Sequence, residues 1–283
     1  MIELKEGDLR LVISRPGTYY QGTRFDHAGV FRMISKGGFV FADEWFDGND
    51  PQTHDHVCGP SEEFVTVNFD GVAPGGTFVK PGVGLLRRPD DAPYDWFRLY
   101  EIADEGRRSE SVSGQEAEFR QVLDGFYDYV KTIRILSDSS FGIYHRMTWL
   151  AEKPLEGYFY NHNFFTFSGA QTGPLRKVDF PFHPEGHWRS HYSSVSLNDR
   201  GIRFTDEPDL PCVYMGDLHS ADGRTPYAFR ISEGSRAVEV RGSGDLDHLV
   251  FWANRRVACP EPYMPVGMKK GDTQHWHVTY GLI

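Results

Sequence analysis

Alternation of apolar and polar residues with a period of two is the dominant pattern in this 283-residue chain. Its longest example is residues 126–136, in which Tyr127, Tyr129, Lys131, Ile133 and Ile135 fall on one side of an extended backbone. A strand with one buried face has this period, whereas a helix repeats about every 3.6 residues. Further strands are expected near residues 9–14, 28–34, 38–46, 64–69, 94–102, 141–150, 157–168, 201–205, 226–231, 236–241, 247–253 and 274–282.

Turn residues separate these runs, and the chain contains 30 glycines and 17 prolines. Only residues 101–122 suggest a helix, and Gly114 with several serines weakens that tendency. Strands do not alternate with helices, and no linker rich in proline or serine divides the sequence. Because 14% of the residues are aromatic, two packed sheets are the natural way to bury them. We therefore expect an all-β fold, with one large antiparallel domain over residues 1–283.

The acidic residues outnumber the basic ones, 40 against 30, which gives a formal net charge of −10. This surplus argues against a general nucleic-acid binder, which needs a basic face, and against a polybasic membrane anchor. Cys58, Cys212 and Cys259 are too few for a disulfide framework. The first residues contain no apolar signal segment, and there is no apolar run long enough for a membrane span. We expect a cytoplasmic protein that binds neither nucleic acid nor membrane.

The 12 histidines raise the question of a metal site. His54 and His56 are followed by Glu62, which is similar to the histidine and glutamate pattern of cupin metal sites. Alternation along a strand would place both imidazoles on one face. The spacing from His56 to Glu62 is longer than that pattern allows, and the residues before the pair have the composition of a loop. A solvated loop is the favoured interpretation, and we expect no metal.

Two later segments carry more chemical information. In residues 158–165, alternation places Tyr160, His162 and Phe164 on one face of a strand. An imidazole among aromatic rings and amides is either a hydrogen-bonded core residue or a titrating group held in one tautomer. In residues 251–265, a strand leads to Glu261, whose flanking prolines stiffen the backbone. That carboxylate is either a fixed functional group or an exposed turn residue.

Taken together, the two segments resemble the galactose mutarotase, or aldose 1-epimerase, superfamily. Residues 161–165, Asn-His-Asn-Phe-Phe, are similar to the family's mid-chain strand that carries a general-acid histidine. Residues 259–262, Cys-Pro-Glu-Pro, are similar to its later turn that carries a general-base glutamate. The resemblance covers the second half of the chain. It implies a large antiparallel β-supersandwich with a sugar cleft on one sheet.

The resemblance also implies a mechanism. Opening a sugar hemiacetal requires a proton for the ring oxygen and removal of the proton of the anomeric hydroxyl. By similarity, His162 is the acid and Glu261 the base, on opposite sides of the substrate, and no metal, cofactor or covalent intermediate is required. The family's earlier Leu-His-Gly-Gly segment and the aromatic segment of its hexose-6-phosphate relatives are absent. The sugar is therefore not identified.

The N-terminal third supplies further candidates for substrate binding. Arg24 and Asp26 are two residues apart, beside tyrosines, so a strand would present them on one face. Their donors and acceptors suit a polyhydroxylated ligand, and a structural ion pair at a sheet edge is the alternative. Lys80 lies in a glycine-rich stretch. It either holds an anionic group of the sugar together with Arg24 or is a solvated surface lysine.

Three residues of the second half complete the expected site. Tyr160 and Asn161 precede His162 and are expected to contact the sugar. Trp188 lies among histidines in an expected loop, where its ring could stack on a pyranose face. The alternative for Trp188 is a core position, because most of the aromatic residues must be buried.

We expect a small sugar as the partner of this chain, and a homodimer remains open. A non-catalytic carbohydrate-binding protein on the same fold is the main alternative, since fold does not determine function. A lyase or glycoside hydrolase acting on an acidic glycan would need a further base or two facing carboxylates. For a mutarotase, we expect His162 and Glu261 to face one another across one cleft, at a separation that fits a sugar.

Overall fold

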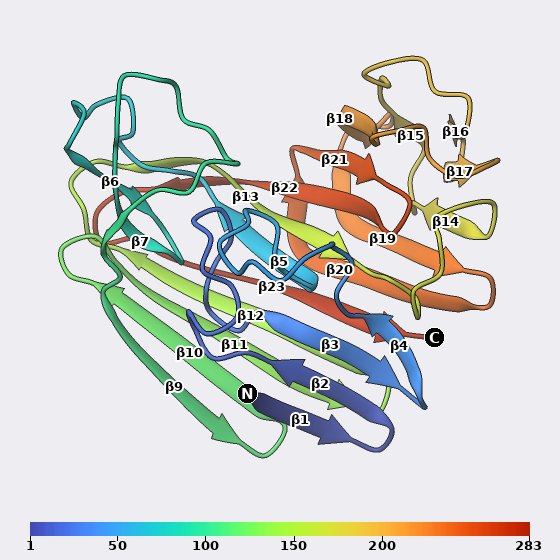
Figure 1. Cartoon of the computed structure of the whole chain (residues 1–283), viewed down its shortest axis with the longest axis horizontal. Helices are drawn as coiled ribbons and strands as arrows, with labels where there is room; N and C mark the ends of the chain where they lie inside the picture. Colours follow the sequence, from blue (N-terminus) through green and yellow to red (C-terminus); the bar gives the residue numbers. More distant parts are fainter.

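The computed structural model describes all residues, 1–283, and every regular element in it is a β-strand. The strands form four antiparallel sheets (Figure 1). The largest has ten strands in the order β16-β17-β14-β19-β20-β23-β12-β11-β10-β9, and the next has six in the order β15-β18-β21-β22-β13-β5. Strands β1–β4 and β6–β8 form two smaller sheets. The expected all-β fold, a large antiparallel β-supersandwich, is confirmed.

The bounds of the strands are as follows. The ten-stranded sheet contains β9 (Arg107–Ser113), β10 (Glu116–Leu123), β11 (Tyr127–Ser137), β12 (Ser140–Trp149), β14 (Arg176–Asp179), β16 (Val195–Asn198), β17 (Gly201–Phe204), β19 (Thr225–Glu233), β20 (Arg236–Leu246) and β23 (Thr273–Leu282). The six-stranded sheet contains β5 (Gly59–Phe64), β13 (Leu155–Phe164), β15 (Pro184–Glu185), β18 (Val213–Ser220), β21 (His248–Ala253) and β22 (Ala258–Met268). The smaller sheets contain β1 (Ile2–Glu6), β2 (Leu9–Ile13), β3 (Phe31–Lys36), β4 (Phe39–Ala42), β6 (Thr77–Lys80), β7 (Gly84–Arg87) and β8 (Ile102–Asp104).

The main core lies between the two large sheets. The ring of Phe64 on β5 lies 5.4 Å from that of Tyr129 on β11, and the ring of Phe159 on β13 lies 4.9 Å from that of Trp276 on β23. These side chains belong to one cluster of 53 buried residues. One face of the six-stranded sheet is therefore buried against the ten-stranded sheet. Its opposite face points away from this core, towards the loops.

Strand β11 confirms the alternation that dominates the sequence. Tyr127, Tyr129, Ile133 and Ile135 are buried, while the residues between them are more exposed. Lys131 shares their face and is also buried, which is rare for an unpaired lysine. Its ammonium group is paired with two carboxylates in the interior.

The weak helical tendency of residues 101–122 does not produce a helix, because this segment forms β8, β9 and β10. Gly114 adopts a positive φ of 58° in the tight turn that joins β9 to β10. Along β10, Ala117, Phe119 and Leu123 alternate with exposed residues and enter the core. The period of two therefore outweighs the helix-forming glutamate, alanine and arginine residues of this stretch.

Two expected strands lie elsewhere. Residues 64–69 were expected to be extended, but the strand is β5, which ends at Phe64, and Asn68 has a positive φ of 70°. Of residues 94–102, only the last belongs to a strand. The rest form a loop that carries the exposed rings of Trp96 and Phe97. Both differences matter because β5 and this loop contribute to the candidate site.

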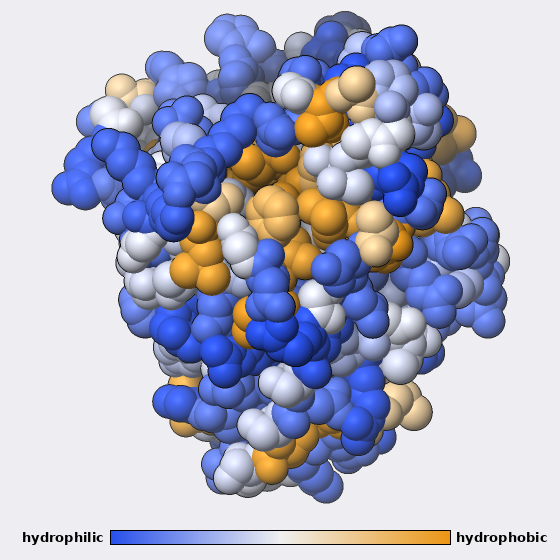
Figure 2. Space-filling model, turned by 90° about the vertical axis from the view of Figure 1, so that its left-hand side faces the viewer, coloured by the Kyte–Doolittle hydropathy of each residue, from blue (hydrophilic) through white to orange (hydrophobic).

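Seen from the left-hand end of Figure 1, the surface is mostly hydrophilic, and apolar side chains gather in a hollow near its centre (Figure 2). The structure contains no helix with the length and apolar character needed to span a membrane.

Candidate functional site

A cavity of about 460 Å³ opens over the outer face of the six-stranded sheet. This volume lies within the usual range for small-molecule sites, about 300–1,000 Å³. Strands β13, β18, β21 and β22 form its floor through Tyr160, Tyr214, Trp252, Glu261 and Tyr263, with other side chains beside them. Loops supply the rest of the wall, so the alternation of four adjacent strands builds one aromatic floor.

His162 and Glu261 meet at this floor. Nε2 of His162 lies 3.1 Å from Oε1 of Glu261, and each residue is only 4% exposed. The expectation that they stand on opposite sides of a substrate is wrong. They lie on neighbouring strands, β13 and β22, and point to the same face of the sheet, so they are side by side on one wall. Glu261 lines the cavity, and His162 lies directly beside it.

The prolines around Glu261 explain the local geometry of these two strands. The ladder between β13 and β22 runs from Leu155–Met268 to Tyr160–Tyr263 and then stops. Pro260 turns its carbonyl towards β13 but has no N–H to donate to that strand. The side-chain amide of Asn163 donates to this carbonyl at 2.9 Å and bridges the gap. The two candidate catalytic groups therefore face each other where the backbone ladder is open.

Aromatic rings enclose His162. Its ring stacks on Phe164 with centroids 4.0 Å apart and meets the edges of Trp252 and Phe25 at 5.8 and 6.0 Å. Nδ1 of the same ring is buried and has no hydrogen-bond partner. Glu261 is the charged group that the imidazole contacts, through Nε2.

Arg24 reaches the cavity as expected, and an ion network holds it there. Its Nε donates to Glu63 at 2.7 Å and its Nη2 donates to the hydroxyl of Tyr160 at 3.0 Å. Burial opposes the charge of this guanidinium. The neighbouring Tyr160, Glu63 and Glu261 outweigh burial and hold the pKa of the group well above its ordinary value. Arg24 is therefore a permanent cation near the candidate base.

Lys80 does not line the cavity. It is 1% exposed, and its Nζ donates to Glu63 at 2.8 Å. Burial alone would raise the pKa of Glu63, but the charges of Lys80 and Arg24 outweigh it and keep that pKa below its ordinary value. Lys80 therefore neutralises a buried carboxylate beneath the site, and neither the expected role in anion binding nor the surface alternative applies.

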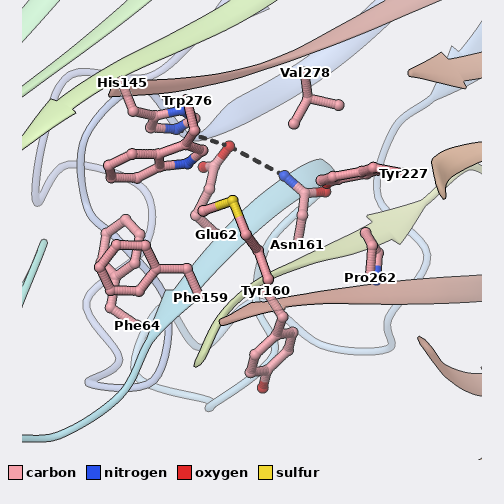
Figure 3. Close-up of a pocket in the computed structure, with 11 residues that line it drawn as sticks. Glu62, Phe64, His145, Phe159, Tyr160, Asn161, Tyr227, Pro262, Trp276 and Val278 are labelled. Atoms are coloured by element: carbon pink, nitrogen blue, oxygen red, sulfur yellow. Dashed lines mark hydrogen bonds and ion pairs between the residues drawn. The ribbon is translucent and has the colours of Figure 1, made fainter. Parts of the chain in front are cut away.

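Asp26 and Asn161 are also turned away from the cavity. The chain around Asp26 is not a strand, so Arg24 and Asp26 do not share a face. Asp26 instead accepts a hydrogen bond from Tyr129 at 2.9 Å in the interior. Asn161 follows the alternation of β13 to the inner face, where its amide donates to Glu62 at 3.1 Å, as Figure 3 shows.

This interior cluster is a second buried charge network, separate from the cavity. Lys131 pairs with Glu62 and lies 3.4 Å from Asp26. Figure 3 also shows the imidazole of His145 beside the Glu62 carboxylate, at 3.5 Å. Burial would raise the pKa of Glu62, but Lys131 and His145 outweigh burial and lower that pKa to about 2. The network joins β5 and β11 inside the sandwich and so supports the strands that carry the site.

Trp188 does not face the cavity either. It forms an isolated β-bridge with Met215, a core residue, and its ring packs against Phe251 at 6.0 Å. The next residue, Arg189, points the opposite way and lines the cavity. The sequence thus predicted correctly that this loop contributes to the cavity. The side chain that does so is Arg189 and not the expected Trp188.

Several cavity residues were not expected as sugar-binding residues from the sequence, among them Tyr214, Tyr263 and Phe97. Tyr263 stacks on Tyr160 with centroids 4.3 Å apart, as expected for cross-strand partners on β22 and β13. Alternation around Glu261 could have identified Tyr263, because the two are separated by one residue. Nothing local distinguishes Phe97 or Tyr214 from core aromatics.

The alternative metal site is not formed. His54 lines the cavity and packs against Phe97, His56 packs against Phe46, and Glu62 lies in the interior network. No group of three or more histidine, cysteine or acidic side chains is arranged to hold a metal ion. Glu261 is also the only carboxylate among the residues that line the cavity. The two facing carboxylates of a glycoside hydrolase are therefore not present there.

Solved structures with the same fold come from the family that the sequence resembles. A candidate aldose 1-epimerase from Escherichia coli K12 matches with a TM-score of 0.63 and 10% identity, covering 99% of this chain and 98% of that chain. A galactose mutarotase-like protein from Lactobacillus casei matches with a TM-score of 0.57 and 10% identity, covering 100% of both chains. A galactose 1-epimerase from Lactobacillus acidophilus matches with a TM-score of 0.53 and 9% identity, covering 99% and 93%.

No protein-family model and no curated protein matches the sequence. The similarity is therefore one of fold. The chain has the galactose mutarotase-like fold over its full length, which confirms the architecture that the two sequence segments implied.

Proposed function

We propose that this protein is a sugar mutarotase, which interconverts the anomers of an aldose by general acid and base catalysis. The observation that carries the proposal is the buried pair of His162 and Glu261 at the aromatic floor of the cavity. An imidazole and a carboxylate in contact form an acid and base couple that can pass a proton in either direction. The fold similarity to an enzyme named galactose 1-epimerase supports the same reaction.

The chemistry requires both groups at one end of the substrate. The ring oxygen and the anomeric hydroxyl oxygen are bonded to the same carbon, so an acid and a base on one wall can reach both. Glu261 takes the proton of the anomeric hydroxyl as the bond between C1 and the ring oxygen breaks, and His162 gives its proton to that oxygen. Rotation of the open-chain aldehyde about its C1–C2 bond and the reverse steps give the other anomer.

Substrate must separate the pair for these steps to occur. In the structure Nε2 of His162 contacts Glu261, which itself lines the cavity. A bound hemiacetal replaces this contact with two hydrogen bonds, one to each of its oxygens. The open ladder beside Pro260 gives the two strands freedom for that small separation.

Other cavity residues have supporting roles in this proposal. Trp252 and Tyr263 offer ring faces for the C–H surface of a pyranose. Arg24 lies near Glu261, and Glu63 and Tyr160 fix the position of this guanidinium. Aromatic faces with a few fixed polar groups are the usual composition of a small-molecule site.

A non-catalytic sugar-binding protein is the second candidate. The direct contact of His162 with Glu261 favours it, because each group already satisfies the other. In that case the pair would be a structural hydrogen bond beneath a binding surface, and the sugar would contact the aromatic residues and Arg24 alone.

One experiment separates the two candidates. NMR exchange spectroscopy at neutral pH measures the interconversion of α and β anomers across a panel of neutral, carboxylated and phosphorylated aldoses. We expect the wild-type protein to accelerate one sugar class. Glu261→Gln and His162→Asn should each lose about 10²–10⁴-fold of that acceleration.

The control variants are His183→Asn and Glu185→Gln, which change the same residue types at exposed positions outside the cavity. Both should retain the wild-type rate. Sugars that bind, as shown by line broadening, but exchange no faster than in buffer would establish the binding protein and refute the mutarotase.

A further inference from the structure

Arg189 is a cation on the cavity wall without a partner anion. No carboxylate lies within ion-pair distance of it, and its side chain makes no hydrogen bond. Its guanidinium carbon lies 5.6 Å from the centre of the Tyr214 ring, which also lines the cavity. This cation–π contact holds the group over the floor and leaves its five N–H donors free.

Most arginines of this chain pair with a carboxylate, although several exposed ones, Arg200 and Arg236 among them, do not. Acidic residues outnumber basic ones, 40 to 30, so carboxylates are in surplus. Exposed arginines such as Arg10, Arg120 and Arg255 each pair with a nearby Asp or Glu. Arg189 is also exposed but has no such partner, and because it stands on the cavity wall it is available to a ligand.

The other charges of the site balance one another. Lys80 and Arg24 are both paired with Glu63, and Arg24 also faces Glu261. Two cations and two carboxylates thus compensate each other at that end of the cavity. Arg189 adds one positive charge that no residue of the lining compensates.

The position of Arg189 relative to Glu261 sets where a ligand charge would lie. Glu261 is on β22, β21 is its neighbour, and Tyr214 is on β18, the next strand. Two interstrand spacings amount to about 10 Å. Arg189 donates its backbone N–H to Tyr214 beyond that strand, and its side chain returns over the Tyr214 ring. The free cation therefore lies over the β18 side of the aromatic floor, and the candidate base lies on β22, two strands away.

We propose that the cavity takes an anionic sugar whose carboxylate or phosphate, remote from the anomeric carbon, binds Arg189. This inference rests on the proposed function for the identity of the ligand as a sugar. The planar guanidinium forms two parallel hydrogen bonds to a carboxylate or to two phosphate oxygens. With the anion held at Arg189, the anomeric end of the sugar is directed towards Glu261 and His162, and the ring crosses Trp252.

The test compares ligands that differ only in charge. Calorimetry at low salt measures the binding of glucuronate and galacturonate against their neutral amides, and of glucose 6-phosphate against glucose. Each titration uses wild-type protein, Arg189→Met and Arg200→Met. Arg200 is the matched control, because it is exposed and lacks a carboxylate partner but lies outside the cavity. Melting temperatures verify that the variants fold.

We expect wild type and Arg200→Met to bind one charged sugar about tenfold more tightly than its neutral analogue. Arg189→Met should remove that preference and leave the affinity for the neutral analogue unchanged. The uronate and phosphate arms then identify which anion is recognised. Equal affinity for charged and neutral sugars, a preference that survives in Arg189→Met, or no binding of any charged sugar at millimolar concentration would overturn the proposal.

These outcomes are independent of catalysis, because calorimetry requires no turnover. Charge-selective binding through Arg189 without any acceleration of anomer exchange would refute only the mutarotase. Acceleration of a neutral sugar, unaffected by Arg189→Met, would refute only the anionic substrate.

Discussion

His162 and Glu261 lie opposite one another on adjacent antiparallel strands, with Nε2 of the imidazole 3.1 Å from Oε1 of the carboxylate. The continued register of β13 and β22 places them in this relation, just beyond the last paired residues, Tyr160 and Tyr263. Both strands are central in their sheet, so the backbone that holds the pair is supported on either side. The pair is therefore held on one wall of the cavity, where both groups are within reach of a bound substrate.

The first prediction concerns Glu63, the carboxylate shared by Arg24, Lys80 and Tyr160. Glu63→Gln removes the charge that compensates the fully buried Lys80. An uncompensated buried charge typically costs about 3–5 kcal/mol. We expect a decrease of that order in the free energy of unfolding, measured by urea denaturation.

Two variants control this measurement. Glu63→Gln combined with Lys80→Met removes both charges and should recover a large part of the lost stability. Glu3→Gln removes an exposed carboxylate that pairs with Arg10 and should change stability little. If Glu63→Gln is as stable as Glu3→Gln, the network does not support the site.

The second prediction is a pH dependence that arises from His27. This residue is 3% exposed, and its Nε2 lies 2.7 Å from the carbonyl oxygen of Gly22. Burial, with a contribution from Arg108, lowers the pKa of His27 to about 4 from 6.5. The unfolded chain therefore binds the proton first, and the stability present above pH 6.5 is lost as the pH falls towards 4.

Between pH 7 and pH 5 this difference amounts to about 2 kcal/mol of unfolding free energy. His27→Gln retains a donor for Gly22 but does not titrate. Urea denaturation at both pH values should show that the variant loses about 2 kcal/mol less than wild type. Equal losses in the two proteins would show that His27 is not held neutral by burial.

The third prediction separates two tryptophans. Trp252 lines the cavity, whereas Trp188 packs on Phe251 in the core. Trp252→Phe should weaken sugar binding by about two- to tenfold, the range expected from the loss of one aromatic contact. Trp188→Phe should lower the melting temperature and leave the affinity unchanged. Calorimetry and thermal denaturation of both variants measure these effects. Weaker sugar binding by Trp188→Phe, with unchanged binding by Trp252→Phe, would show that the sugar does not bind in this cavity.

The sequence was sufficient to predict the strands that carry the chemistry. Alternation identified β11, β12 and β13, and the two segments around His162 and Glu261 implied the fold that the structure has. The prediction failed where alternation was applied to residues that are not in a strand. Arg24 and Asp26 are separated by one residue, yet one faces the cavity and the other the interior, because residues 21–28 form an irregular segment with a bend at 23–25.

The remaining differences between the predicted and the observed site arise from tertiary contacts, which the local sequence does not show. The local sequence around Lys80 is typical of a surface lysine. Its burial depends on the ion pair with Glu63, seventeen positions earlier. Trp188 and Arg189 are neighbours, and only the bridge from Trp188 to Met215 determines which of them faces the cavity. The opposed arrangement of acid and base was wrong because the sequence does not show that their strands are adjacent.

The central claim is that His162 and Glu261 act together on one sugar. Its most direct test is the NMR rate of anomer exchange for wild type, Glu261→Gln, His162→Asn and the double variant, on the sugar that wild type accelerates most. The account predicts that each single variant loses at least about 100-fold of the acceleration, and that the double variant loses no more than the worse single one. Acceleration that persists in either single variant would contradict it.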